Sequence, residues 1–203
     1  MTKSTLLKSL LCSVALFFSL QAKLQIITTV AGGIGGYSGD GGLALNAGLG
    51  NAFDVDFDKA DNMYIVQKYH NVVRKVNKST GIITTIAGNG TAGYSGDNVL
   101  GAQAQLNDPI SVAVDSFGNI YIADHFNERI RKVDGTTGII TTIAGTGVNG
   151  YSGDGGLAIN AKIQDPIGVA VDALGNNLYI AEGGRKQDKK SKSDNRNYYN
   201  NSG

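Results

Sequence analysis

The sequence contains one cysteine, two prolines, two histidines and no tryptophan among its 203 residues. A single cysteine excludes an internal disulfide framework, and so few histidines and cysteines leave little from which to build a zinc site. Charged residues make up only 17% of the chain, and no apolar run approaches the roughly 20 residues of a membrane-spanning helix. Glycine, in contrast, occurs 29 times. This composition favours an all-β chain with many turns over a helical bundle.

The N-terminus has the pattern of an export signal. Lys3 and Lys8 lie before an apolar run at residues 10–20, which is too short to cross a bilayer as a helix. We therefore predict a signal peptide over residues 1–22 and a secreted, extracellular mature chain with no membrane contact. Cys12 lies inside this signal, so the mature chain has no cysteine. A membrane anchor is the alternative for the same segment.

Charge is distributed unevenly along the chain. Between residues 24 and 182 there are nine Lys and Arg against fifteen Asp and Glu, so the small positive net charge of the whole chain comes from its two ends. Nucleic-acid binding draws much of its affinity from basic side chains that neutralise phosphates, so this acidic region disfavours it. Residues 183–203 are basic, aperiodic and poor in apolar side chains. We predict that they form a disordered tail.

A repeat is the strongest pattern in the sequence. The pentapeptide Gly-Tyr-Ser-Gly-Asp occurs at residues 36–40, 93–97 and 150–154, each copy 57 positions after the one before. Arg74 and Arg131 recur with the same spacing. A fixed period of this size indicates a repeat architecture in which each unit stacks on its neighbours.

Each period contains four short segments with strand character, rich in β-branched or alternating apolar side chains and separated by turn residues. Four antiparallel strands per repeat are typical of a propeller blade. In the second copy we expect the strands at residues 110–114, 120–123, 129–133 and 139–143. The predicted blades lie at about 53–87, 110–144 and 167–182, with an N-terminal strand at 26–31.

Hairpin turns are expected after the first strand of each blade. Asp58, Asp115 and Asp172 begin these turns. Gly118 and Gly175 occupy a turn position at which a positive φ is expected, and Asp61 stands at that position in the first copy.

Three segments of the second copy carry a family pattern. They are Asp-Pro-Ile-Ser-Val-Ala-Val-Asp at 108–115, Gly-Asn-Ile-Tyr-Ile-Ala-Asp at 118–124 and Asn-Glu-Arg-Ile-Arg-Lys-Val at 127–133. The pattern resembles the NHL repeat, which implies an all-β fold of NHL-type β-propeller blades, each a four-stranded antiparallel sheet, over residues 24–182. Propellers close with about four to eight blades, so about three blades make an incomplete ring. Either copies of the chain self-associate to complete a propeller, or the chain is a truncated relative of a longer protein.

The Gly-Tyr-Ser-Gly-Asp loops are the predicted contact sites, because loops on a rigid scaffold often carry binding residues. One aspartate per loop is too few for calcium, so we interpret these aspartates as turn-forming. Arg74 and Arg131 are interpreted as part of the solvent face of a third strand. The predicted loop-contact residues are Tyr37, Asp40, Tyr94, Asp97, Tyr151 and Asp154.

No catalytic, cofactor-binding or metal site is predicted. His70 and His125 do not occupy equivalent repeat positions, and neither pairs with a nucleophile in the repeat. Sequons predict glycosylation at Asn77 and Asn89. We expect a secreted, non-catalytic binding scaffold without a cofactor, whose inter-blade loops contact protein or carbohydrate. The alternatives are a propeller enzyme or metal-binding protein of lactonase or lyase type and, disfavoured by charge, a nucleic-acid-binding NHL domain.

Overall fold

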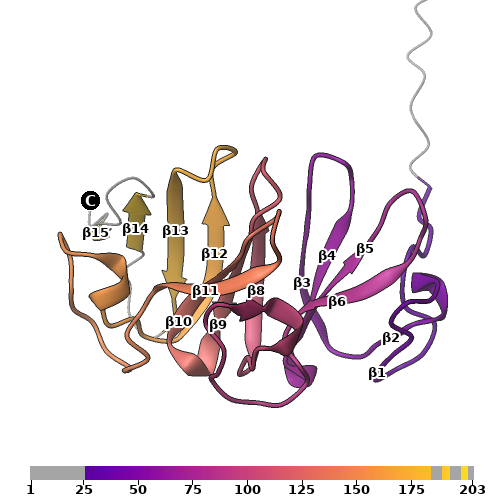
Figure 1. Cartoon of the computed structure of the whole chain (residues 1–203), viewed down its shortest axis with the longest axis horizontal. Helices are drawn as coiled ribbons and strands as arrows, with labels where there is room; N and C mark the ends of the chain where they lie inside the picture. Colours follow the sequence, from indigo (N-terminus) through magenta and orange to yellow (C-terminus); the bar gives the residue numbers. More distant parts are fainter. Residues whose placement is uncertain (1–25, 184–188, 193–197, 201–203) are drawn as a thin grey trace, which may run out of the picture.

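The computed structural model describes residues 26–183, 189–192 and 198–200. Its three main sheets stand side by side, and within each sheet the strands of a blade pair antiparallel in sequence order (Figure 1). The predicted all-β architecture of propeller blades is therefore confirmed. Within the described residues the three blades do not close into a ring.

The blades are built from short strands joined by tight turns. Blade 1 consists of β3 (Ala52–Phe57), β4 (Met63–Gln67), β5 (Val72–Val76) and β6 (Ile83–Ala87). Blade 2 consists of β8 (Pro109–Val114), β9 (Ile120–Asp124), β10 (Arg129–Val133) and β11 (Ile139–Ala144), with β7 (Val99–Leu100) added beside β11. Blade 3 consists of β12 (Pro166–Val171), β13 (Asn177–Glu182), β14 (Lys189–Lys192) and β15 (Tyr198–Asn200).

Smaller elements lie in the segments that precede or connect the strands. They are β1 (Tyr37–Ser38) and β2 (Gly48–Leu49), which pair with each other, and the 3-10 turns η1 (Ala44–Asn46), η2 (Lys68–His70), η3 (Gly101–Gln103), η4 (His125–Asn127) and η5 (Ala158–Asn160). None of the described helices is long and apolar enough to cross a membrane.

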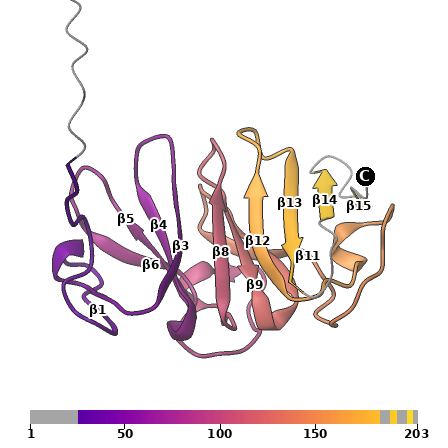
Figure 2. The same ribbon diagram turned by 180° about the vertical axis from the view of Figure 1, so that it is seen from behind.

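The inner strands β3, β8 and β12 lie next to one another (Figure 2), and side chains of one bind the backbone of the next. Asp54 Oδ2 on β3 accepts hydrogen bonds from the Ser111 hydroxyl (2.7 Å) and the Val112 amide (2.9 Å) on β8. Ser111 occupies the same repeat position one blade later, and its hydroxyl oxygen accepts a bond from the Val169 amide of β12 (3.2 Å). An innermost strand has one unpaired backbone edge, so these side chains satisfy donors that no neighbouring strand reaches.

Two apolar clusters fill the spaces between the blades, as expected for sheets that bury both faces only when stacked. In both clusters a tyrosine of the preceding blade packs against aliphatic side chains of the next blade. Between blades 1 and 2 the cluster includes Tyr64, Val66, Val73, Leu106, Val112, Ile120, Ile122 and Ile140. Between blades 2 and 3 it includes Tyr121, Ala123, Ile130, Ile163, Val169, Leu178 and Ile180.

The hairpin turns form as predicted. Asp115 Oδ1 accepts bonds from the Phe117 and Asn119 amides, both at 2.9 Å, and Asp115 Oδ2 accepts the Tyr121 hydroxyl at 3.1 Å. Asp58 begins the equivalent turn of blade 1. Burial raises the pKa of Asp58, but the hydrogen bonds donated by Asn62, Tyr64 and Ala60 together hold it below its ordinary value.

The predicted left-handed turn position is also confirmed. The φ angles are +58° at Asp61, +79° at Gly118 and +72° at Gly175. Aspartate takes this conformation at some cost, whereas glycine takes it freely. The first repeat therefore keeps the turn geometry without the glycine.

Two predictions about the ends of the chain differ from the structure. Residues 26–30 form no strand, and Ile26 and Ile27 are 83% and 98% exposed, because the outer edge of blade 3 is already occupied by β14 and β15. Those two strands lie in the segment predicted to be disordered, since backbone pairing with β13 does not need apolar side chains. The predicted signal peptide and the remainder of the predicted tail lie outside the described residues.

Candidate functional site

The aspartate of the first Gly-Tyr-Ser-Gly-Asp loop binds a buried arginine. Asp40 Oδ1 accepts bonds from Arg74 Nε (3.0 Å) and Nη2 (2.6 Å), and Asp40 Oδ2 accepts the Thr85 amide (3.0 Å). The Arg74 side chain is fully buried. Its other donors reach the carbonyl oxygens of Ser38 and Gly48, each at 3.0 Å. The loop is thus fastened to β5 and β6 of the blade that follows it.

The second loop is fastened in the same way. Asp97 Oδ1 accepts bonds from Arg131 Nη2 (2.8 Å) and from the Thr142 hydroxyl (3.1 Å). Arg131 is also fully buried and lies 3.4 Å from Asp124 Oδ2. In the third copy Lys189 pairs with Ile180, the register position at which Arg131 pairs with Ile122 in blade 2, so a lysine replaces the arginine there.

Two interpretations from the sequence are therefore wrong. Arg74 and Arg131 do not belong to a solvent face, because the preceding loop covers them and supplies the acceptors that a buried guanidinium needs. Asp40 and Asp97 are ion-pair partners of these arginines, and their carboxylates do not cap the turns of their own loops. A strand pattern of alternating Arg and apolar residues does not reveal which face a distant loop will cover.

The tyrosines of the loops pack against the same groups. The Tyr37 ring centroid lies 5.1 Å from the Arg74 guanidinium carbon, and that of Tyr94 lies 5.0 Å from the Arg131 carbon. In the third loop the Tyr151 hydroxyl donates to Asp154 Oδ2 at 2.7 Å. The polar groups of these loop residues are therefore engaged within the protein, and their contact with a ligand stays a prediction.

A second group of side chains lies at the end of blades 1 and 2 that is opposite the β3–β4 and β8–β9 hairpin turns (Figure 1). We call it the inner-edge cluster. It combines aromatic rings, a cation, carboxylates and an imidazole that come from η2, η4 and the residues before the inner strands. Its members are Phe53, Lys68, Tyr69, Asp108, His125, Phe126 and Asp165.

The aromatic part of the inner-edge cluster is exposed. Tyr69 and Phe126 stand 57 positions apart, at equivalent repeat positions, and are 58% and 56% exposed. Tyr69 meets Phe53 edge to face at 5.8 Å, and Lys68 Nζ lies 4.9 Å and 5.2 Å from the centroids of Phe53 and Tyr69. This pair was not predicted from the sequence because the two residues differ in type. The recurrence of an aromatic at one repeat position was the signal available.

The polar part of the cluster links the two blades. Lys68 Nζ lies 3.6 Å from Asp108 Oδ2, which joins η2 of blade 1 to the start of β8. Burial lowers the pKa of His125, and Lys68 lowers it further, against the opposing effects of Asp165, Glu128 and Asp108. His125 Nδ1 is buried without a hydrogen-bond partner. The imidazole is therefore neutral at neutral pH and keeps unused hydrogen-bonding capacity.

In the part of the chain that the structure describes, no group of three or more His, Cys, Asp or Glu side chains is placed to hold a metal ion. Of the two sequons, Asn77 lies at a turn where its Oδ1 accepts the Ser79 and Thr80 amides, each at 3.0 Å. Asn89 is exposed, and its Nδ2 donates a long bond of 3.4 Å to the Gln103 carbonyl. Glycosylation at these two positions stays a prediction.

Comparisons with known proteins agree with the architecture. No family model matches the chain. The chain is 32% identical over 126 residues to Protein SUPPRESSOR OF QUENCHING 1, chloroplastic, of Arabidopsis thaliana, which covers 59% of this chain and 12% of that protein. It is 26% identical over 152 residues to NHL repeat-containing protein 2 of Homo sapiens, which covers 72% of this chain and 20% of that protein. The chain thus spans a fifth or less of the length of these curated relatives.

A solved structure shows the same fold. A structural genomics protein of unknown function from Bacteroides thetaiotaomicron matches with a TM-score of 0.55 and 26% identity, over 69% of this chain and 32% of that one. The stacked four-stranded blades, the 57-residue repeat and these similarities agree with one another. Together they support the assignment of these repeats to the NHL-repeat β-propeller family.

Proposed function

We propose that this chain is an exported, non-catalytic binding module that holds a protein or carbohydrate ligand at its inner-edge cluster. The observation that carries the proposal is the pair of exposed rings, Tyr69 and Phe126, at equivalent positions of neighbouring blades. Exposed aromatic side chains offer large rigid contact areas and are enriched at binding surfaces. The proposal of export rests on the signal pattern at residues 1–22.

The polar members of the cluster suit recognition by hydrogen bonding. Lys68 and Asp108 present a cation and a carboxylate beside the rings, and the neutral His125 adds an imidazole. A few polar groups among aromatic side chains fix the orientation of a ligand in many binding sites. The loops that carry Asp40 and Asp97 use their carboxylates internally, which favours the inner-edge cluster as the surface that meets the ligand.

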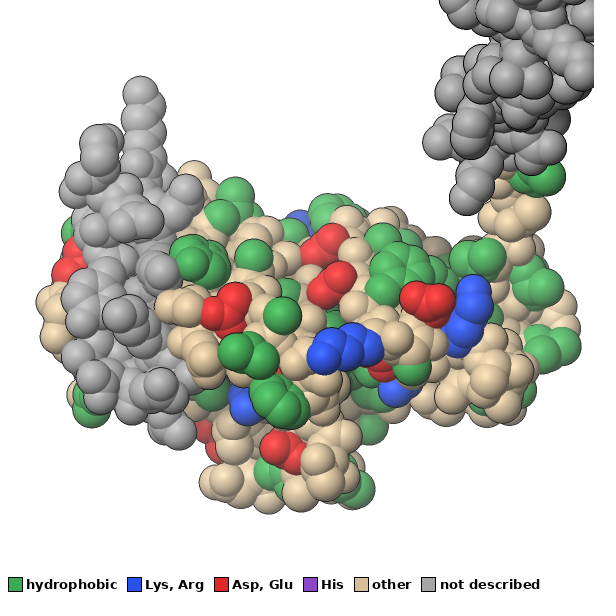
Figure 3. All heavy atoms as spheres, turned by 90° about the horizontal axis from the view of Figure 1, so that it is seen from above, with side chains coloured by type: hydrophobic (Ala, Val, Ile, Leu, Met, Phe, Trp, Pro, Cys, Tyr) green, Lys and Arg blue, Asp and Glu red, His purple; other side chains and the backbone are tan. Residues whose placement is uncertain are grey.

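The rival functions have less support. An enzyme or metal-binding protein of lactonase or lyase type requires converging ligands, which the described residues do not bring together. Seen from the hairpin end, acidic and basic side chains are interspersed among apolar ones (Figure 3), and the described residues on this face form no continuous basic track for a phosphate backbone.

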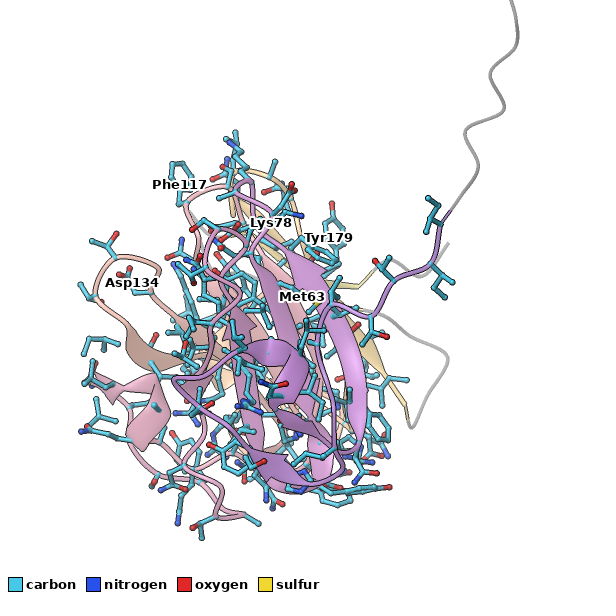
Figure 4. The ribbon with its side chains drawn as sticks, turned by 90° about the vertical axis from the view of Figure 1, so that its right-hand side faces the viewer. Met63, Lys78, Phe117, Asp134 and Tyr179 are labelled. Carbon is cyan, nitrogen blue, oxygen red and sulfur yellow. The ribbon has the colours of Figure 1, made fainter. Side chains whose placement is uncertain are left out.

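The test is a binding screen of the purified chain against a glycan array and a peptide library, followed by calorimetry on the ligand found. We expect Tyr69→Ala and Phe126→Ala each to weaken binding about tenfold or more, as truncated aromatic anchors do. Phe117→Ala is the matched control, because Phe117 is 67% exposed and lies at the hairpin end of blade 2 (Figure 4). Unchanged affinity in both cluster variants, or chemical conversion of the ligand, would contradict the proposal. N-terminal sequencing of chain recovered outside the cell tests export.

A further inference from the structure

Blade 1 exposes the face that the other blades bury. We call the side of each blade that faces the preceding one its leading face. Val55 on the leading face of blade 1 is 48% exposed, whereas its repeat equivalents Val112 and Val169 are only 4% and 8% exposed. Phe57, on the same face of β3, is 52% exposed, whereas its equivalents Val114 and Val171 pack partly buried against the two interblade clusters. Figure 4 looks onto this side of the molecule, with Met63 of β4 labelled.

Blade 3 exposes the opposite side, which we call its trailing face. Tyr179 is 41% exposed, whereas its equivalents Tyr64 and Tyr121 are 2% and 4% exposed inside the two interblade clusters. Ala170 is also exposed, although the equivalent Ala113 is buried between blades 2 and 3. The described part of the chain therefore ends in two unlike faces, each being one half of an interface that the chain already forms twice.

The tyrosine of the trailing face matches a hollow on the leading face. Inside the chain, Tyr121 packs in one cluster with Val169, Leu178 and Ile180. The equivalents of those three residues in blade 1 are Val55, Met63 and Ile65, and they line an open hollow of about 290 Å³. Tyr179 of a second copy would meet them in the arrangement that Tyr121 has within one chain.

The side-chain sizes of the two faces are complementary as well. In the chain, Asp54 lies beside Val112, and Asp56 Oδ2 accepts the Val114 amide at 2.8 Å. The same relation between trailing and leading positions would place Gly168 beside Val55 and Ala170 beside Phe57. Phe57 is bulkier than its equivalent Val114. It would meet the small Ala170, whereas Val114 meets Asp56.

We propose that two copies of this chain assemble head to tail, with the trailing face of blade 3 of each copy packed on the leading face of blade 1 of the other. The described residues of two copies supply six blades, which lies within the range of about four to eight at which propellers close, whereas those of three copies would supply nine. Closure of unlike faces into a ring gives a two-fold symmetric dimer in which neither face stays exposed. This assembly does not rest on the proposed ligand.

The test is the solution mass of the full chain by light scattering on a sizing column, over a range of concentrations. We expect twice the mass of one chain for the wild type. Phe57→Asp on the leading face and Tyr179→Asp on the trailing face should each give monomers, because both side chains are exposed within one chain and become buried only in the dimer. Phe117→Asp, at an exposed hairpin, should remain dimeric. Far-UV circular dichroism checks that each variant is folded.

Mixing the two variants separates the proposed geometry from other dimers. In an equimolar mixture of the Phe57→Asp and Tyr179→Asp chains, one of the two interfaces joins unmodified faces, so we expect dimer to reappear. A dimer formed by two leading faces would be insensitive to Tyr179→Asp, and the Phe57→Asp chain would stay monomeric in the mixture. A monomeric wild type, a larger oligomer, or a dimer that survives Tyr179→Asp overturns the proposal.

Discussion

Replacing Arg74 by methionine tests the view that a buried arginine holds the preceding loop on its blade. Methionine has similar length and fills the space, but it donates no hydrogen bond. The change removes bonds to Asp40, to the Ser38 and Gly48 carbonyls and to Gln67 Oε1, which span 2.6–3.3 Å. The two carbonyl oxygens and the buried Gln67 are then left without this donor.

The expected cost follows from burial. Removing one partner of a buried ion pair destabilises a protein by about 3–5 kcal/mol, chiefly because the other partner is left unpaired. The Asp40 side chain is 41% exposed and can be rehydrated, which places the expected loss at the lower end of that range. Loss of the contact with the Tyr37 ring adds a smaller amount, about 0.5–1 kcal/mol. We therefore expect Arg74→Met to lower the free energy of unfolding by about 3.5–4 kcal/mol.

The assay is urea denaturation at one protein concentration, together with amide hydrogen exchange of residues 36–50. Lys75→Met is the matched control, because Lys75 is the next residue of the same strand, its side chain is 30% exposed and its Nζ lies 3.7 Å from Asp58. An ion pair of this kind contributes about 0–1 kcal/mol. Equal losses in the two variants, or unchanged exchange in the loop after Arg74→Met, would refute the reasoning.

Two further predictions concern aspartates. Asp54→Ala leaves the Ser111 hydroxyl and the Val112 amide without their acceptor between blades 1 and 2, so we expect a loss of about 1–3 kcal/mol in the free energy of unfolding, and a smaller loss for Asp54→Asn, measured in urea. Burial raises the pKa of Asp124 to about 6, against the opposing effect of Arg131 and other donors. A carboxyl whose folded pKa exceeds its unfolded value of 3.8 stabilises the fold most when it is protonated. The stability of the wild type relative to Asp124→Asn should therefore fall, by at most about 3 kcal/mol, as the pH rises from about 4 through 6. A stability difference that is independent of pH in this range contradicts the second prediction.

The sequence predicted the blades because each strand repeats with its own turn residues. Asp58 and Asp115 and the positive-φ position at Gly118 recur at a fixed spacing, so local chemistry and repeat length agreed. When local turn chemistry and repeat length indicate the same structure, the fold can be predicted from one sequence. The strands and hairpins of blades 1 and 2 therefore needed no knowledge of tertiary contacts.

The environment of the arginines could not be read in this way. Arg131 and Lys132 look alike on β10, and the loop that covers Arg131 lies 34 residues earlier, at Asp97. Arg131 is buried and Lys132 is not, because this long-range contact covers only Arg131. The inner-edge cluster was hidden for a similar reason, because Lys68 and Asp108 meet only when two blades stack.

The direction of the arginine–aspartate pairing has a consequence for how such chains change in length. Each pair joins a loop to the blade that follows it within the same 57-residue unit, as Asp40 with Arg74 and Asp97 with Arg131 show. Duplication or deletion of one unit therefore adds or removes both partners together, and no buried guanidinium loses its carboxylate. Gene duplication can thus vary the number of blades in a chain built from such repeats one unit at a time, with the internal ion pairs of every remaining blade intact.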